Sequence, residues 1–233
     1  MPYTRRPDLY DVEYGAKDYA GEADAVERLV RTHAPGAGTL LDVACGTGKH
    51  LEHLNARFAC EGVDLDGGLL EVARARLPGV PLHRADMREV DLGRRFDVVT
   101  CLFSAIGFVG GPDGLRAAVR SLARHVAPGG VLLVEPWLTP EDWIPNRPHL
   151  LTHQSDDLVL ARVTLSGLRG ERISTTEMHY TVAKPAGIDQ FVETHELYLF
   201  TLDEMRASFE AAGLRVEHDA YGLIGRGLWI CRP

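Results

Sequence analysis

The stretch Leu40-Leu-Asp-Val-Ala-Cys-Gly-Thr-Gly48 decides the fold of this chain. Its apolar first half suits a buried parallel strand, and two glycines then lead into a predicted helix that starts at Lys49. Glycine has no Cβ, so the backbone of this turn can come close to a ligand. The spacing matches neither the GxGxxG of dinucleotide-binding folds nor the GxxxxGKS/T of the P-loop. Asp42, ahead of the loop, would repel a phosphate and suits a cationic ligand that bears an ammonium and a sulfonium.

Apolar strands and helices alternate on both sides of this loop. Strands are predicted over 39–43, 59–63, 80–83, 95–103 and 131–135, and helices over 16–33, 49–57, 68–77 and 112–126. This alternation specifies an α/β Rossmann-like fold, in which helices cover both faces of a parallel sheet.

The pattern changes after Trp137. Alternating, β-branched stretches over 158–165, 171–182 and 191–200 predict antiparallel strands, and a helix over 202–212 and strands over 214–219 and 227–231 follow. An insertion of this length within an α/β domain is usually functional. We therefore expect an N-terminal helix and cofactor-binding core over 1–137, an antiparallel β insertion after the fifth strand over 138–200 that forms a substrate lid, and a closing helix and strands over 201–233.

Charge and composition argue against several classes of partner. The 233 residues carry a formal net charge of −8, which disfavours nucleic acid and an anionic membrane surface. No run of about 18 apolar residues occurs, so we expect a cytoplasmic protein without membrane contact. The four cysteines are widely spaced and form no CxxC pair, so we expect buried thiols and no metal site.

Two further acids follow predicted strands. Asp64 ends the second strand, where a carboxylate can accept both hydroxyls of a ribose. Asp86 and Met87 follow the third strand, where an acid can accept from an adenine amino group while a thioether packs on the ring. A lone acid in such a place is more often a helix cap or a surface group. Together with Asp42, these acids stand at the carboxyl ends of three successive strands and indicate a nucleoside site.

Short motifs elsewhere in the chain narrow the assignment to one protein family. They are Asp8-Leu-Tyr-Asp11, Ala16-Lys-Asp-Tyr19, Asp86-Met-Arg88, Val99-Thr-Cys-Leu-Phe-Ser104, Ala127-Pro-Gly-Gly130, Glu135-Pro-Trp137 and Gly225-Arg-Gly-Leu228. With the glycine loop, they make the chain resemble the class I S-adenosylmethionine-dependent methyltransferases. Among these it is similar to the N-methyltransferases that make the dimethylamino sugars of macrolide antibiotics from nucleotide-linked 3-aminosugars. The resemblance implies a seven-stranded methyltransferase sheet, S-adenosylmethionine as cofactor and a thymidine diphosphate (TDP)-linked aminosugar as substrate. Related enzymes form dimers, so it also suggests a homodimer.

The resemblance further implies roles for individual residues. Those expected at the cofactor are Tyr14 and Tyr19 at the methionyl end, Asp42, Ala44 and Gly46 along its backbone, Asp64 and Leu65 at the ribose, Asp86 and Met87 at the adenine, and Leu102 and Ser104 beside the reactive methyl. Those expected at the substrate are Tyr10, Phe108, Trp137, Arg162, His179 and Arg226, with the two arginines at the diphosphate. Catalysis would consist mainly of positioning, with Tyr14, Glu135 and His179 as candidate proton acceptors.

One departure from the family bears on the substrate. The family pattern Phe-Ser-Ser-Ile-Gly-His is here Phe103-Ser-Ala-Ile-Gly-Phe108, so a phenyl ring stands where an imidazole would lie near the attacking amine. Phe108 cannot accept a proton, but it can form an apolar wall or an aromatic face for a cation. An N- or O-methyltransferase of another small secondary metabolite therefore stays open as an alternative. A cofactor-binding protein without catalysis is disfavoured by Trp137, His179 and Arg226 at the expected sheet edge.

Overall fold

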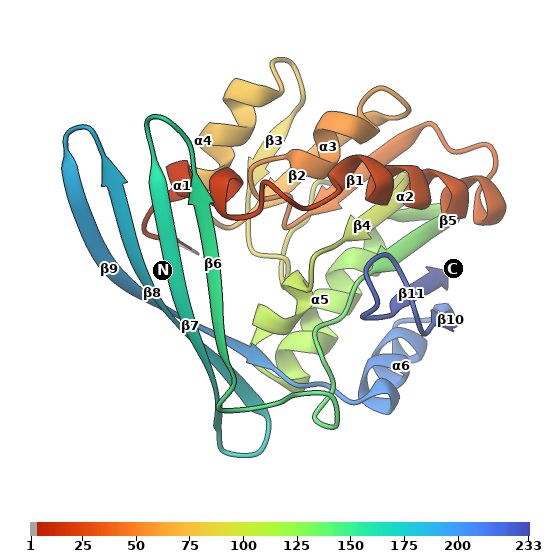
Figure 1. Ribbon diagram of the computed structural model, residues 1–233. Coiled ribbons are helices and arrows are strands. Elements are labelled where there is room, and N and C mark those ends of the chain that lie inside the picture. Colours follow the sequence, from red (N-terminus) through yellow and green to blue (C-terminus); the bar gives the residue numbers. More distant parts are fainter. Residues whose placement is uncertain (1–3) are drawn as a thin grey trace.

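The computed structural model describes residues 4–233 and contains a central sheet and a second, separate sheet (Figure 1). The central strands are β1 (Thr39–Val43), β2 (Ala59–Asp64), β3 (Leu82–Arg84), β4 (Phe96–Cys101), β5 (Val126–Val134), β10 (Arg215–Asp219) and β11 (Leu228–Arg232). Their order is β10-β11-β5-β4-β1-β2-β3. The strands β1 to β5 run parallel to one another, and β11 runs antiparallel to both of its neighbours, β5 and β10. The predicted seven-stranded Rossmann-like sheet is confirmed.

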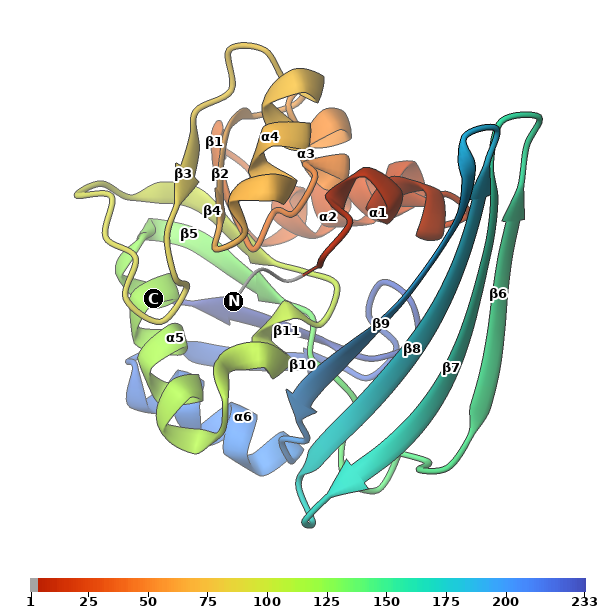
Figure 2. The ribbon, with the colours of Figure 1, turned by 90° about the vertical axis from the view of Figure 1, so that its left-hand side faces the viewer.

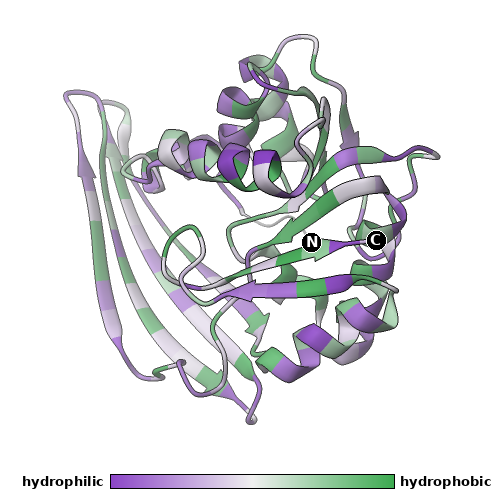
Figure 3. Ribbon diagram, turned by 90° about the vertical axis from the view of Figure 1, so that its right-hand side faces the viewer, coloured by the Kyte–Doolittle hydropathy of each residue, from purple (hydrophilic) through white to green (hydrophobic). Residues whose placement is uncertain are grey.

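Helices cover both faces of this sheet. On one face lie α2 (Tyr19–His33), α3 (Lys49–Leu54) and α4 (Gly67–Arg76), and on the other α5 (Pro112–Arg124) and α6 (Leu202–Ala211) (Figures 1 and 2). Side-chain caps fix several of their starts: the Asp66 carboxylate accepts from the backbone of Gly68 at 2.8 Å, and Thr201 and Glu204 form a capping box. The inner strands β1, β4, β5 and β11 are largely hydrophobic (Figure 3) and mostly buried. Burial on both faces explains their nearly continuous apolar sequences, whereas the edge strands β3 and β10 are polar and partly exposed.

The second sheet follows β5 and is antiparallel, as predicted. It consists of β6 (Pro148–Gln154), β7 (Val159–Arg169), β8 (Ile173–Lys184) and β9 (Gly187–Tyr198), hydrogen-bonded in that order. It curves over the edge of the core where the parallel strands end (Figure 2). Its inner face packs on the short helix α1 (Pro7–Glu13), whose Leu9 lies in an apolar cluster with side chains of β7 and β8. The sheet and α1 thus wall the region where ligands bind in such folds.

Several boundaries differ from the expected ones for local reasons. The expected helix over 16–33 begins at Tyr19, because the Asp18 side chain accepts from the Gly21 amide and caps it. The strand expected over 131–135 begins earlier, at Val126, and its pairing with β4 is irregular between Val126 and Val131. The helix α1, the 3-10 helix η1 (Ala105–Val109) and the strand β6 were not anticipated. They are short or mostly exposed, so they leave little hydrophobic periodicity in the sequence.

The cysteines and the helices agree with the composition. Cys45, Cys60, Cys101 and Cys231 are free thiols buried in the core. Among residues 4–233, none of the helices combines the length and the apolar character that crossing a bilayer requires.

Candidate active site

A cavity of about 480 Å³ opens at the carboxyl ends of the central parallel strands, between the glycine loop, α1 and β9. The predicted site residues that line it are Tyr10, Tyr19, Asp42, Ala44, Gly46, Asp64, Leu65, Asp86, Met87, Leu102 and Phe108. Tyr14, Ser104, Glu135, Trp137, Arg162, His179 and Arg226 lie outside its lining. The residues expected at the cofactor are therefore mostly gathered in one place, and those expected at the substrate are mostly spread around it.

The glycine loop is shaped by left-handed backbone. Gly46 has a φ of 57° and Gly48 a φ of 76°, conformations that favour glycine. A Cβ on Gly48 would meet the Leu77 side chain at 2.7 Å, so this glycine is needed for packing on α4. A Cβ on Gly46 would meet no protein atom within 4 Å, although Gly46 lines the cavity. The space that Gly46 keeps clear is therefore available to a ligand.

Two carboxylates flank this loop and are held in place before any ligand binds. Asp42 is almost fully buried and accepts from the Thr100 hydroxyl at 2.7 Å, and burial raises the pKa of Asp42 to about 6. Asp64 accepts from the backbone amides of Gly46 and Asp66, each at 2.8 Å. Burial raises the pKa of Asp64, and these backbone hydrogen bonds oppose the rise. Both acids thus sit at the strand ends with fixed orientation.

Asp86 lies on the opposite wall with its own cation. The Arg88 guanidinium donates to both of its oxygens, at 3.0 and 3.1 Å from Nε, and the Arg88 amide donates at 2.9 Å. The hydrogen bond from Arg88 holds the pKa of Asp86 below its ordinary value. Asp86 is therefore an ionised acceptor beside the Met87 thioether, as a site for an adenine requires.

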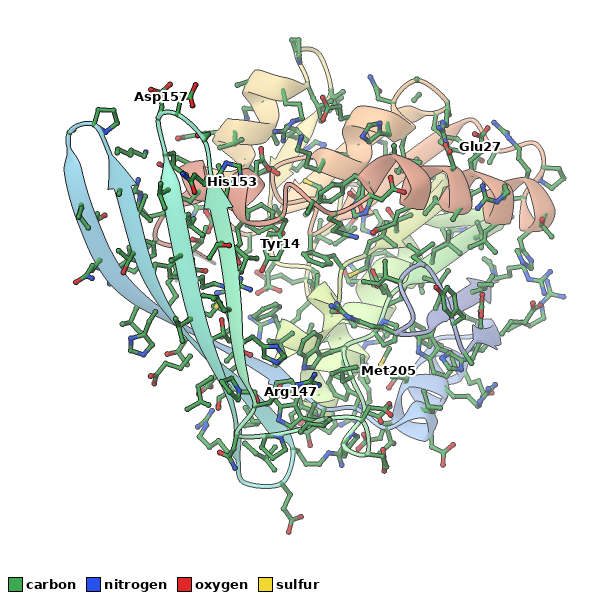
Figure 4. All side chains as sticks on the ribbon, in the orientation of Figure 1. Tyr14, Glu27, Arg147, His153, Asp157 and Met205 are labelled. Carbon is green, nitrogen blue, oxygen red and sulfur yellow. The ribbon has the colours of Figure 1, made fainter. Side chains whose placement is uncertain are left out.

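Tyr14 stands at the end of α1, between the core and the second sheet (Figure 4). Its ring contacts Tyr10, with centroids 4.9 Å apart, and meets Phe103 edge-on at 5.1 Å. Burial raises the pKa of the Tyr14 hydroxyl well above its ordinary value. A phenol in this environment can donate a hydrogen bond but takes up no proton at neutral pH, which counts against Tyr14 as a proton acceptor.

The two predicted diphosphate arginines have protein partners. Arg162, on the inner face of β7, pairs with Glu13 of α1, and the Tyr180 hydroxyl donates to the same carboxylate at 3.0 Å. Arg226 donates to the Ser104 hydroxyl at 2.9 Å and lies over the Trp137 ring at 5.1 Å. In this state Arg162 ties the second sheet to α1, and Arg226 braces the turn after β4.

That turn joins the narrower sequence motifs. Phe103 and Ser104 have φ values of 52° and 62°, a strained backbone for side-chain-bearing residues. Glu135, fully buried at the end of β5, accepts from the Phe103 amide at 2.6 Å, and Ser104 donates to the Pro136 carbonyl at 2.8 Å. The other oxygen of Glu135 has no hydrogen-bond partner within residues 4–233, and burial raises the pKa of this acid.

His179 lies apart from these residues. Its side chain is 57% exposed and pairs with Glu177 at 2.6 Å. The inner face of β8 carries the buried neighbours Met178 and Tyr180, so the alternation of the strand turns His179 to the outer face. From there it does not reach the cavity.

The site fits an adenosyl group that ends in a cationic amino-acid tail, and the comparisons with known proteins agree. Residues 40–130 match the model of a methyltransferase domain. Over 97% of its length the chain is 44% identical to dTDP-3-amino-3,6-dideoxy-alpha-D-glucopyranose N,N-dimethyltransferase of Streptomyces fradiae, of which 90% is covered. The chain belongs to the methyltransferase family.

Solved structures resemble the methyltransferase over its full length. The crystal structure of DesVI from Streptomyces venezuelae is 43% identical and superposes with a TM-score of 0.94, covering 99% of both chains. The SAM-bound structure of CalS10, an amino pentose methyltransferase from Micromonospora echinaspora involved in calicheamicin biosynthesis, is 40% identical and has a TM-score of 0.88, covering 99% of this chain and 98% of that one. Both similarities include the second sheet.

Three residues that support the site of the methyltransferase were not predicted from the sequence. Asp11 of α1 accepts from the Thr47 hydroxyl at 2.7 Å and pairs with Arg76, which fastens the helix to the glycine loop. His50, which lines the cavity, pairs with Glu22 at 2.8 Å. His195 of β9 also lines the cavity and meets Phe108 edge-on, with ring centroids 5.7 Å apart. Asp11 belongs to a quoted motif, but nothing in the sequence separates His50 and His195 from the other histidines.

Proposed function

We propose that this methyltransferase transfers a methyl group from S-adenosylmethionine to the amino group of a TDP-linked aminosugar. The observation that carries the proposal is the 44% identity, over 97% of the chain, to a relative named for that reaction. The inner face of the second sheet, which closes one side of the cavity, supports it further. Residues 138–200, which contain this sheet, would act as a substrate lid between the core of 1–137 and the closing elements of 201–233.

The cavity residues support a definite placement of the cofactor. Asp64 would accept the ribose hydroxyls, with Leu65 beside them, and Asp86 and Met87 would hold the adenine. The methionyl end would lie along the glycine loop, with Asp42, Ala44 and Gly46 on one side and Tyr14 and Tyr19 on the other. S-adenosylmethionine supplies a methyl group already activated on a sulfonium. Leu102 and Ser104 would border that methyl group.

The chain itself must place the acceptor and remove its proton. An amine attacks only in its neutral form, and burial beside positive charge favours that form. Tyr10, Phe108 and Trp137 offer aromatic surface for the sugar and the thymine, and Arg226, by leaving Ser104, could meet the diphosphate. Placing the nucleophile about 3 Å from the methyl and excluding water would account for most of the rate.

Calorimetry tests the proposal in two steps. S-adenosylhomocysteine is titrated first, and thymidine diphosphate is then titrated into the saturated complex. Binding in both steps, followed by methylation of a TDP-linked 3-aminosugar detected by mass spectrometry, is the expected outcome. Binding in the first step only would retain the methyltransferase and exclude the TDP-linked sugar. A TDP-linked 4-aminosugar, assayed in parallel, defines the position of the accepted amine.

A second candidate function rests on Phe108. Because the imidazole of the family pattern is absent there, an N- or O-methyltransferase of another small secondary metabolite is the alternative substrate class. Methylation of a non-nucleotide amine or phenol, without binding of thymidine diphosphate, would favour it.

We also propose a cytoplasmic homodimer. The outer face of the second sheet exposes Leu150, Val163 and Val192 in one row, with His179 of β8 between the two valines, and this mostly apolar row suits contact with a second copy. Light scattering should give twice the chain mass of 25.6 kDa, and Val163→Glu should return it to the monomer value. A monomer in the unmodified protein would refute the dimer. We propose no nucleic-acid partner, in keeping with the net charge of −8.

A further inference from the structure

The strand β9 places the imidazole of His195 beside Phe108, the residue that stands where the family pattern has a histidine. Glu193, His195 and Leu197 point inward on this strand, and His195 is only 14% exposed in its side chain. Its ring lies edge-on to Phe108 at 5.7 Å, with an angle of 80° between the ring planes. Both side chains line the cavity.

The helix η1 and the strand β9 approach each other closely at Gly107. Gly107 lies next to Phe108, and a Cβ there would meet the Leu197 side chain at 3.0 Å and the Trp137 Cβ at 3.1 Å. This small residue therefore lets η1 press against β9, and it fixes the position of the Phe108 ring relative to His195. Phe108 also follows within a few residues of the Phe103–Ser104 turn, which ends β4 at the cavity.

Several other groups that line the cavity and could take a proton are held by partners of their own, as Asp42 is by the Thr100 hydroxyl. Asp86 is paired with Arg88, Asp64 accepts two backbone amides, and His50 is paired with Glu22. The tyrosines that line it have pKa values raised by burial. His195 is the histidine that the second sheet adds to this wall.

We infer that the imidazole of His195 accepts the proton that the substrate amine must lose, a step that Phe108 cannot perform. The inference rests on the proposed function, because it presumes an amine acceptor. The imidazole takes one proton from the substrate ammonium, and the freed lone pair on nitrogen forms the new N–C bond. The C–S bond to the transferred methyl breaks, and its electron pair goes to the sulfur. The imidazolium then gives its proton to solvent.

The electrostatic surroundings suit this role. Glu193 lies on the same strand, with a carboxylate oxygen 3.9 Å from Nε2 of His195, and would stabilise the imidazolium. Across the strand pair, His195 faces the neutral Thr176 of β8. Other charged groups that line the cavity include Glu196 of β9, which pairs with Arg169, and the Asp86–Arg88 pair. The helix η1 has the sequence Ala-Ile-Gly-Phe-Val and contributes no charged group.

The test exchanges the two rings. His195→Phe should lower the rate of methyl transfer to a TDP-linked aminosugar about 100-fold and abolish the acidic limb of the pH–rate profile. Phe108→His combined with His195→Phe should recover at least tenfold, because an imidazole then stands on the neighbouring ring position of the same cavity wall. His33→Gln, at the end of α2, is the matched control and should keep the rate within twofold. A His195→Phe rate above one third of the unmodified rate, with an unchanged pH profile, would overturn the inference.

Two binding measurements separate this inference from the proposed function. By calorimetry, His195→Phe should bind S-adenosylhomocysteine within twofold of the unmodified protein. In NMR spectra of that complex, the His195 imidazole signals, identified by their loss in His195→Gln, should shift on adding the aminosugar nucleotide and much less on adding thymidine diphosphate. If both nucleotides bind and the signals do not move, the inference is wrong and the proposed function stands. If neither nucleotide binds, both are refuted.

Discussion

Replacing Asp64 by asparagine should weaken both the fold and the cofactor site. Each oxygen of Asp64 accepts a backbone amide at 2.8 Å, from Gly46 and from Asp66. An asparagine has one oxygen and one NH2 group, so in either orientation its NH2 group faces an N–H donor. One buried amide then loses its acceptor, which costs about 1 to 3 kcal/mol of unfolding free energy. For a chain of this size that is a fall in Tm of about 2 to 12 °C.

The same substitution should reduce the affinity for S-adenosylhomocysteine. A hydrogen bond to a charged acceptor contributes about 1.5 to 3 kcal/mol, so losing one ribose contact raises Kd roughly 10- to 150-fold. Calorimetry gives the Kd, and thermal unfolding without ligand gives the Tm. Asp91→Asn is the control, because Asp91 is exposed, also accepts from a backbone amide, that of Gly93, and does not line the cavity. A Kd within threefold and an unchanged Tm for Asp64→Asn would refute this account of the loop.

Three further predictions concern groups around the cavity. Burial raises the pKa of Asp42 to about 6, from an ordinary value near 4, so ionising it destabilises the fold as pH rises from about 4 to 6. In chemical denaturation without ligand, the unfolding free energy of Asp42→Asn should therefore gain up to about 3 kcal/mol over that of the unmodified protein between pH 4 and pH 7. A difference that stays constant with pH would contradict this. Glu13→Gln or Arg162→Met alone leaves a buried charge without its partner and should lower the unfolding free energy by about 3 to 5 kcal/mol. The double variant should lose less than the sum of the two single losses. Additive losses in this double-mutant cycle would show that the pair is not coupled. Arg226→Lys should lower the methyl-transfer rate about tenfold, because lysine cannot both donate to Ser104 and lie flat on an aromatic ring. Its affinity for S-adenosylhomocysteine should stay within twofold of that of the unmodified protein. An unchanged rate would show that the guanidinium plays no part.

The core of the fold and the cofactor end of the site could be predicted from the sequence because their signals are local. A strand, an acid and two glycines in one continuous stretch determine the loop around Gly46. Asp64 and Asp86 each follow a strand directly, and parallel strands bring their carboxyl ends to the same edge of a sheet. Their placement in one cavity needed no knowledge of distant contacts.

The substrate side could not be predicted in the same way, because it depends on pairings between distant segments. Arg162 meets Glu13 across 149 positions of the chain, and no local pattern records such a pair. The two histidines depend on strand phase, since a shift by one residue moves a side chain to the other face. The buried neighbours Met178 and Tyr180 already place His179 outward. On β9, however, the apolar Val192 is exposed and the charged Glu193 is buried, while Leu197 is buried in the same phase as His195, so hydrophobicity alone leaves the face of His195 undecided.

The anchoring of α1 has a consequence for successive turnovers. Asp11 fastens the helix to the glycine loop, Glu13 fastens it to β7, and Glu193 of β9 accepts from Thr4 and Arg5 just ahead of it. Tyr10 of this helix lines the cavity, so α1 is both a wall of the site and a bridge between the core and the second sheet. If the spent nucleoside leaves past α1, its departure requires these three contacts to loosen. The dwell time of the by-product, more than the chemistry of transfer, would then set the rate of turnover.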